Sequence, residues 1–184
     1  MTLPLTHDKL SPRERYIVPG VAALALGAVI PALTVADTAN TNVAIVANVV
    51  ANCISTSTPI AFGNYNPFDP QPLMAVGTLT LTCTQEATPS VAIGLGTNPS
   101  GGVRRMTALG GGVLPYSILT PTSPGPDATC TGATTDYPTV APGFTLTPAP
   151  SFAPRTFTVC GKIASGISTP IGSYADTVLA TISF

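Results

Sequence analysis

Alternation of apolar and polar side chains is most regular in residues 41–53, which read TNVAIVANVVANC. One face of this stretch is wholly apolar, and the other mixes asparagine with alanine and valine. A period of two in a segment rich in β-branched residues is typical of a β-strand with one buried face. We therefore expect a strand whose apolar row must pack against a partner. The row begins with Val43, Ile45, Ala47 and Val49.

The same period recurs in shorter segments along the rest of the chain. In residues 73–83, leucines and Cys83 share one face, and threonines occupy the other. Helical periodicity is absent after Asp37, and many short strands between Gly/Pro turns predict an all-β sandwich or barrel. The last strand is expected over residues 174–184, with Val178, Ala180, Ile182 and Phe184 on one face. Other strands are expected at residues 60–63, 90–95, 114–118, 144–147 and 156–163.

Charged residues are sparse in this chain, at 8% of 184 residues, against about 25% in a typical soluble domain. Hydrophobic residues make up 45%, which is too many for a disordered chain. The formal net charge of −1 gives no reason to expect nucleic acid or an anionic membrane surface as a partner. The composition therefore indicates one folded, turn-rich domain with a surface of threonine and serine.

Residues 1–36 have the order of a secretory signal peptide. A positively charged start is followed by an uncharged run from Tyr16 to Ala36 that ends in Thr-Val-Ala. A basic start, an apolar centre and a small-x-Ala exit predict cleavage after Ala36. The alternative is an uncleaved membrane anchor, because the run approaches the roughly 20 residues that a spanning helix needs.

Catalytic chemistry is poorly supplied once the leader is set aside. The single histidine, His7, lies in the leader, so residues 37–184 have no imidazole to activate a serine or cysteine. Asp176 is expected to accept hydrogen bonds from nearby backbone amides in a turn, and Arg104 and Arg105 are expected on a solvated face. We predict no enzyme activity, no catalytic residues and no cofactor.

Four cysteines follow the leader, and an even count in an exported chain predicts two disulfides. Three connectivities are possible. Sequential pairing would close two loops of similar length, each stabilising the fold by roughly 3–4 kcal/mol. A metal site is not expected, because the spacing has no Cys-x-x-Cys and no histidine is at hand. The cysteines are Cys53, Cys83, Cys130 and Cys160.

The closing run of the chain resembles the spore coat protein U domain family. Its signature here is Gly172-x-Tyr174-x-Asp176-Thr177, followed by an alternating terminal strand. Further pieces that are similar to the family occur in the same order, so the resemblance covers nearly all of residues 42–184. These pieces are Val49–Cys53, Ile60–Tyr65, Leu79–Thr84, Arg105–Met106 and Leu114–Tyr116.

The family includes subunits of archaic chaperone–usher pili, and the resemblance implies an immunoglobulin-like sandwich that lacks its last strand. A periplasmic chaperone would fill the open groove first. The N-terminal extension of another copy, or of a related pilin, would then replace it at an outer-membrane usher. On this interpretation residues 37–48 are the donor strand and residues 49–184 form the pilin domain. The inward row of the donor is Val43, Ile45 and Ala47, continued by Val49 at the boundary. The final strand would edge the groove.

The function expected from the resemblance is that of a secreted, self-polymerising pilus subunit for adhesion and biofilm formation, in the shaft more than at the tip. A second hypothesis is a self-contained secreted coat or carbohydrate-binding β-sandwich. In that case the N-terminal strand would fold back into its own sheet, and the protein would be a stable monomer.

Overall fold

The computed structural model describes residues 38–184, so the expected signal peptide at residues 1–36 lies outside the described residues. The chain separates after Ile45 into an N-terminal unit and a compact unit of residues 46–184. All the strands of the described residues belong to the second unit, and residues 38–184 contain no helix.

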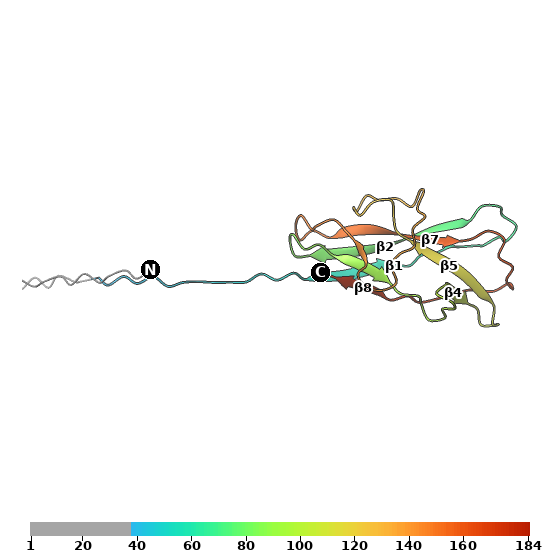
Figure 1. The fold of residues 1–184 in the computed structure, drawn as a ribbon, viewed down its shortest axis with the longest axis horizontal. Helices are drawn as coiled ribbons and strands as arrows, with labels where there is room; N and C mark the ends of the chain where they lie inside the picture. The colour runs from blue at the N-terminus through green and yellow to red at the C-terminus, as the bar shows by residue number, and fades with distance from the viewer. Residues whose placement is uncertain (1–37) are drawn as a thin grey trace, which may run out of the picture. The chain divides into compact units, whose positions relative to one another are not determined.

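The compact unit is built from eight strands. Figure 1 shows how they are arranged, with β1, β2, β4, β5, β7 and β8 labelled. Their bounds are β1 Cys53–Thr58, β2 Leu73–Cys83, β3 Ser90–Ile93, β4 Arg104–Thr107, β5 Val113–Leu119, β6 Phe144–Thr145, β7 Arg155–Ile163 and β8 Ala180–Ser183.

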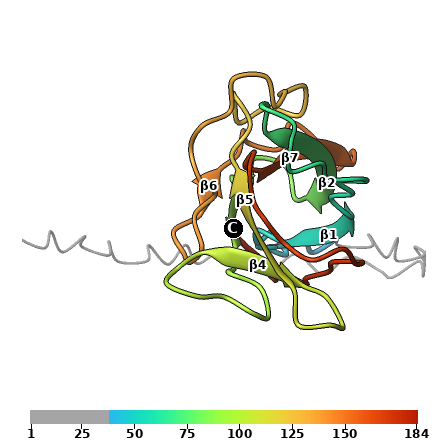
Figure 2. The ribbon, with the colours of Figure 1, turned by 90° about the vertical axis from the view of Figure 1, so that its right-hand side faces the viewer.

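Two antiparallel sheets enclose the core. One sheet has five strands in the order β1-β2-β7-β5-β4, and the other has three in the order β6-β3-β8. In the end-on view the strands of both sheets surround the interior (Figure 2). The predicted all-β, immunoglobulin-like class is thus the class observed, with most pairings formed between segments far apart in the sequence.

The long strand β2 shows why the alternation was informative. Leu79, Leu81 and Cys83 point inward and are buried. The threonines face outward, where Thr80 Oγ1 lies 2.9 Å from Thr156 Oγ1 on the neighbouring strand β7. Cross-strand Thr pairs of this kind stabilise the exposed face of a sheet.

Some segments differ from their sequence-based predictions. Residues 60–63 form no strand, and β4 covers residues 104–107, where no strand was predicted. Only residues 180–183 of the expected terminal strand are paired as a strand, while Ala175 makes an isolated bridge to Thr107. Residues 38–52 have no strand assignment, and β1 begins at Cys53.

Arg104 is not on a solvated face, so that expectation was wrong. Its side chain is only 4% exposed. The guanidinium donates to the carbonyl oxygens of Gly94 at 2.9 Å and Tyr137 at 3.3 Å, and also to that of Ile93. Burial lowers the pKa of Arg104. Because three carbonyls replace the lost water, this buried cation joins β4 of one sheet to the end of β3 in the other. Its neighbour Arg105 is half-buried.

Candidate strand-accepting groove

Four strands of the compact unit lie at a sheet edge and pair on one side only, namely β1 and β4 in one sheet and β6 and β8 in the other. Two of these, β1 and β8, border the site described here. β1 pairs with β2 and lies at the end of the five-stranded sheet, while β8 pairs with β3 at the end of the other. Each of these strands therefore presents an edge of unpaired backbone groups within the described part of the chain. Such edges are templates for pairing with another strand.

A groove of about 420 Å³ lies between these two edges. One wall comes from the end of β1 and the residues after it, and the opposite wall comes from the approach to β8. The floor is mostly apolar and is contributed by both sheets. The walls are Ser57–Ile60 with Phe62 on one side and Tyr174–Val178 with Ala180 on the other, and the floor is Thr78, Leu79, Ile93, Met106, Tyr116, Ile118 and Val159.

Ile60 and Phe62 reach the first wall because glycines lie beneath them. A Cβ atom on Gly161 would stand 2.5 Å from Ile60 Cγ2 and 2.7 Å from Phe62 Cζ. A Cβ on Gly77 would stand 2.7 Å from Ile60 Cγ1. The segment therefore crosses over the inner face of β2 and β7 where those strands carry no side chain. Such glycines mark a close approach, which is the signal that would have identified this wall from sequence.

Replacing Gly161 with alanine is expected to destabilise the fold by about 1–3 kcal/mol, because Ile60 and Phe62 would have to move. The matched control is Gly110→Ala, where a Cβ would meet no atom within 4 Å. That control is expected to change stability by less than about 0.5 kcal/mol. Urea unfolding of both variants measures the difference, and equal stabilities would contradict this account of the wall.

The second wall is fixed by the carboxylate of Asp176. Its Oδ1 accepts from the Thr97 backbone N–H at 2.9 Å and from Thr97 Oγ1 at 2.7 Å, and its Oδ2 accepts from the Tyr116 hydroxyl at 2.7 Å. Gly96 has a φ of +88°, and any Cβ there would overlap this carboxylate. The strongest partners therefore come from distant parts of the chain, whereas the sequence suggested only neighbouring amides.

The electrostatics of this wall follow from those bonds. Partial burial raises the pKa of Asp176, but hydrogen bonds from Thr97, Tyr116 and the Thr177 backbone outweigh it, so the net shift is downward. The pKa of Tyr116 is raised, first by burial and then by its hydrogen bond to Asp176. The pair is thus a carboxylate accepting from a neutral phenol. The contacts of Thr97 and Tyr116 with Asp176 were not predicted from the sequence, because no local pattern links these residues.

The expected final-strand residues take different positions. Val178 and Ala180 lie in the groove wall, and Ile182 is half-buried against the core. Phe184 lies just beyond β8 and is 52% exposed. The expected donor residues Val43, Ile45, Ala47 and Val49 are all exposed and lie outside any strand.

The four cysteines form two disulfides, with the sequential connectivity of the three that were possible. Cys53 is bonded to Cys83, and Cys130 is bonded to Cys160. The first joins the start of β1 to the end of β2, and the second ties the long loop after β5 to β7. No group of three His, Cys, Asp or Glu side chains is placed to hold a metal ion in residues 38–184. The same residues include no helix long and apolar enough to cross a membrane.

Fold and groove together define an immunoglobulin-like β-sandwich with an apolar groove between the unpaired edges of β1 and β8. Residues 37–181 match the Spore Coat Protein U domain, and the chain belongs to that family. No curated protein sequence matches the chain.

The fold is shared with a solved pilus assembly complex. That structure is the chaperone–tip adhesion subunit pre-assembly complex, CsuC–CsuE, from the archaic chaperone–usher Csu pili of Acinetobacter baumannii. The TM-score is 0.51 at 20% identity, covering 74% of this chain and 40% of the other. The similarity is one of fold, and this chain spans well under half the length of the chain that it matches.

Proposed function

We propose that this protein is a structural subunit of a secreted surface pilus and that it polymerises by donor-strand complementation. The observation that carries the proposal is the groove between the unpaired edges of β1 and β8, with its apolar floor. Residues 37–48 of a neighbouring copy, or of a related pilin, are the donor. Their aliphatic side chains cover the apolar floor, and their backbone pairs with the free edges of β1 and β8.

The proposed contact is strong enough for a fibre. Inserting Val43, Ile45, Ala47 and Val49 would contribute on the order of 1–3 kcal/mol for each larger side chain. Backbone pairing along β1 and β8 would add roughly 0.5–1.5 kcal/mol for each hydrogen bond. A subunit with an open groove would aggregate through the same edges.

The partners follow from this need for protection. A periplasmic chaperone occupies the groove until an outer-membrane usher exchanges it for the donor of the next subunit. The fold similarity to a complex of a pilus subunit with its chaperone supports this order. The surface pilus then serves adhesion and biofilm formation. Asp176 is the carboxylate in the groove lining, and its oxygens are engaged by Thr97 and Tyr116, so we assign it no catalytic role.

Deleting residues 37–48 tests the proposal. The shortened chain is expected to remain bound to its chaperone in the periplasm, because the groove is intact, but to form no fibres. Electron microscopy of cells that express the full or shortened chain, together with its chaperone and usher, gives the answer. Normal fibres from the shortened chain would refute donor-strand assembly. A full-length protein that refolds alone into a stable closed monomer would favour the self-contained coat domain instead.

A further inference from the structure

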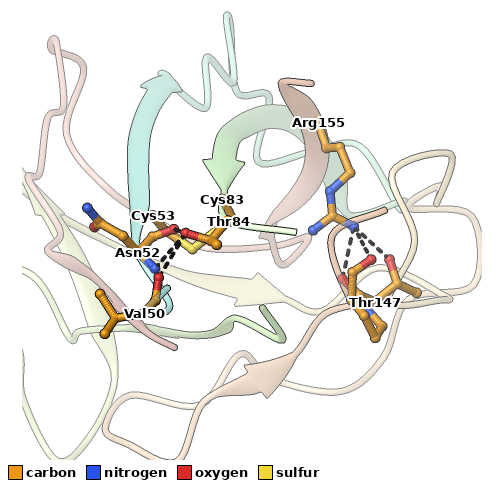
Figure 3. The surroundings of a disulfide bond; sticks show 8 residues. Val50, Asn52, Cys53, Cys83, Thr84, Thr147 and Arg155 are labelled. Atoms are coloured by element: carbon orange, nitrogen blue, oxygen red, sulfur yellow. Dashed lines mark hydrogen bonds between the residues drawn. A yellow bond between two sulfur atoms is a disulfide. The ribbon is translucent and has the colours of Figure 1, made fainter. Parts of the chain in front are cut away.

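The pairing of β1 with β2 continues beyond the ends of both strands. Cys53 lies opposite Cys83 in the ladder and is bonded to it. In the next pair, the Thr84 backbone N–H donates to the Asn52 carbonyl at 2.8 Å, and the Asn52 N–H donates to Thr84 Oγ1 at 3.1 Å. Figure 3 shows these bonds beside the disulfide.

The Thr84 hydroxyl also contacts the chain two residues before Asn52. Its Oγ1 lies 3.3 Å from the carbonyl oxygens of both Val50 and Asn52 (Figure 3). The side chains of Val49 and Val50 are exposed, so little apolar burial fixes their path. The direction in which the chain enters β1 is therefore set by Thr84 and by the Cys53–Cys83 disulfide.

The direction in which the chain enters β1 decides whether the N-terminal segment can reach its own groove or only that of another copy. Ser90 at the start of β3 pairs with Ser183 at the end of β8, and β3 begins shortly after β2 ends. Cys53 therefore lies at the same end of the two sheet edges as the end of β8, beyond the residues that line the groove. Residues 50–53 continue the line of β1, so a segment that placed Val43–Val49 in its own groove would have to reverse within residues 50–52. That reversal breaks the bonds to Thr84.

We propose that Thr84 and the Cys53–Cys83 disulfide form a clamp that denies the N-terminal segment access to its own groove, leaving the groove to a second copy. This inference rests on the proposed function. A tethered segment competes at an effective concentration of about millimolar, so without a restraint self-closure would outcompete donors supplied at micromolar concentration by roughly 1,000-fold. The clamp removes this concentration advantage, because it directs the tethered segment away from its own groove.

The test compares three variants of the full chain after removal from chaperone. Thr84→Val removes the hydroxyl, Thr82→Val is the control on the same outward face of β2, and a Gly-Ser-Gly-Gly insertion between Asn52 and Cys53 supplies a free turn. The insertion keeps all four cysteines, so both disulfides can still form. Closed monomer is quantified by size-exclusion chromatography and native mass spectrometry. Protection of residues 43–49 from protease confirms that the segment is buried.

We expect Thr84→Val to give about tenfold more closed monomer than Thr82→Val, the effect of losing one or two hydrogen bonds, and the insertion variant to be mostly closed. Equal amounts of closed monomer from the two threonine variants would overturn the clamp, as would an insertion variant that polymerises like the parent. Neither result touches the proposed function. A parent chain that is itself a closed monomer would instead overturn the proposed function.

Discussion

Replacing Ile45 with aspartate is expected to stop polymerisation, whereas replacing its neighbour Val46 with aspartate is expected to leave it nearly unchanged. The alternation places Ile45 in the inward row of the donor segment and Val46 on the opposite face. Losing the isoleucine forfeits about 1.5–3 kcal/mol of burial. A carboxylate in an apolar groove costs several kcal/mol more. Together these losses weaken donor binding about 1,000-fold or more.

The pair of variants is well matched, because Ile45 is 92% exposed and Val46 is 90% exposed in the single chain. Neither substitution therefore disturbs the fold of the subunit itself, and both proteins should bind chaperone normally. Fibre assembly from chaperone-bound subunits, followed by electron microscopy and light scattering, separates them. If both variants assemble at the same rate, residues 43–49 do not enter a groove as an alternating strand.

The faces of individual strands could be predicted from the sequence because they depend on a local period. Leu79 and Leu81 are buried where the alternation places them, and Val178 with Ala180 faces the interior near the groove. The number of disulfides could be predicted from the count of cysteines, whereas their pairing stayed open among three connectivities. These features need only the chain near each residue, together with the rule that apolar rows are buried.

The groove itself could not be derived from such patterns. Ile60 and Phe62 alternate like a strand, yet they form a wall, because Gly77 and Gly161 on distant strands leave room for them. Which sheet edges stay unpaired is a property of the whole topology, so the open strand position came only with the resemblance to a family.

Arg104 illustrates an error with a clear physical cause. Two adjacent arginines normally indicate a solvated face, but successive side chains of a strand point to opposite faces, so Arg104 and Arg105 of β4 do too. The inward arginine finds three carbonyl oxygens at the end of β3 and in the loop at Tyr137. Tertiary structure brings those acceptors to Arg104, so they could not be predicted from the local sequence.

Replacing Asp176 with asparagine is expected to destabilise the subunit by about 2–4 kcal/mol. Hydrogen bonds to a charged acceptor are worth about 1.5–3 kcal/mol, and this charge is lost. In addition, the amide NH2 group of asparagine would face a hydrogen-bond donor of Tyr116 or Thr97. Asp127→Asn is the control, since that side chain is exposed. Urea unfolding measures the stability of both variants.

Because Asp176 ties the wall at residues 174–180 to β5 and the loop at Thr97, the same substitution should also weaken binding of a donor peptide with the sequence of residues 38–52.

The effect of Asp176→Asn should depend on pH in one direction. The folded-state pKa of Asp176 is lowered relative to an unfolded value near 4, so its charge stabilises the fold above the unfolded pKa. That stabilisation is lost as the pH falls through the folded pKa. The difference in unfolding free energy between the parent and Asp176→Asn should therefore be full near neutral pH and shrink below about pH 4. A difference that stays constant down to about pH 2 would show that shape, and not the carboxylate charge, holds this wall of the groove.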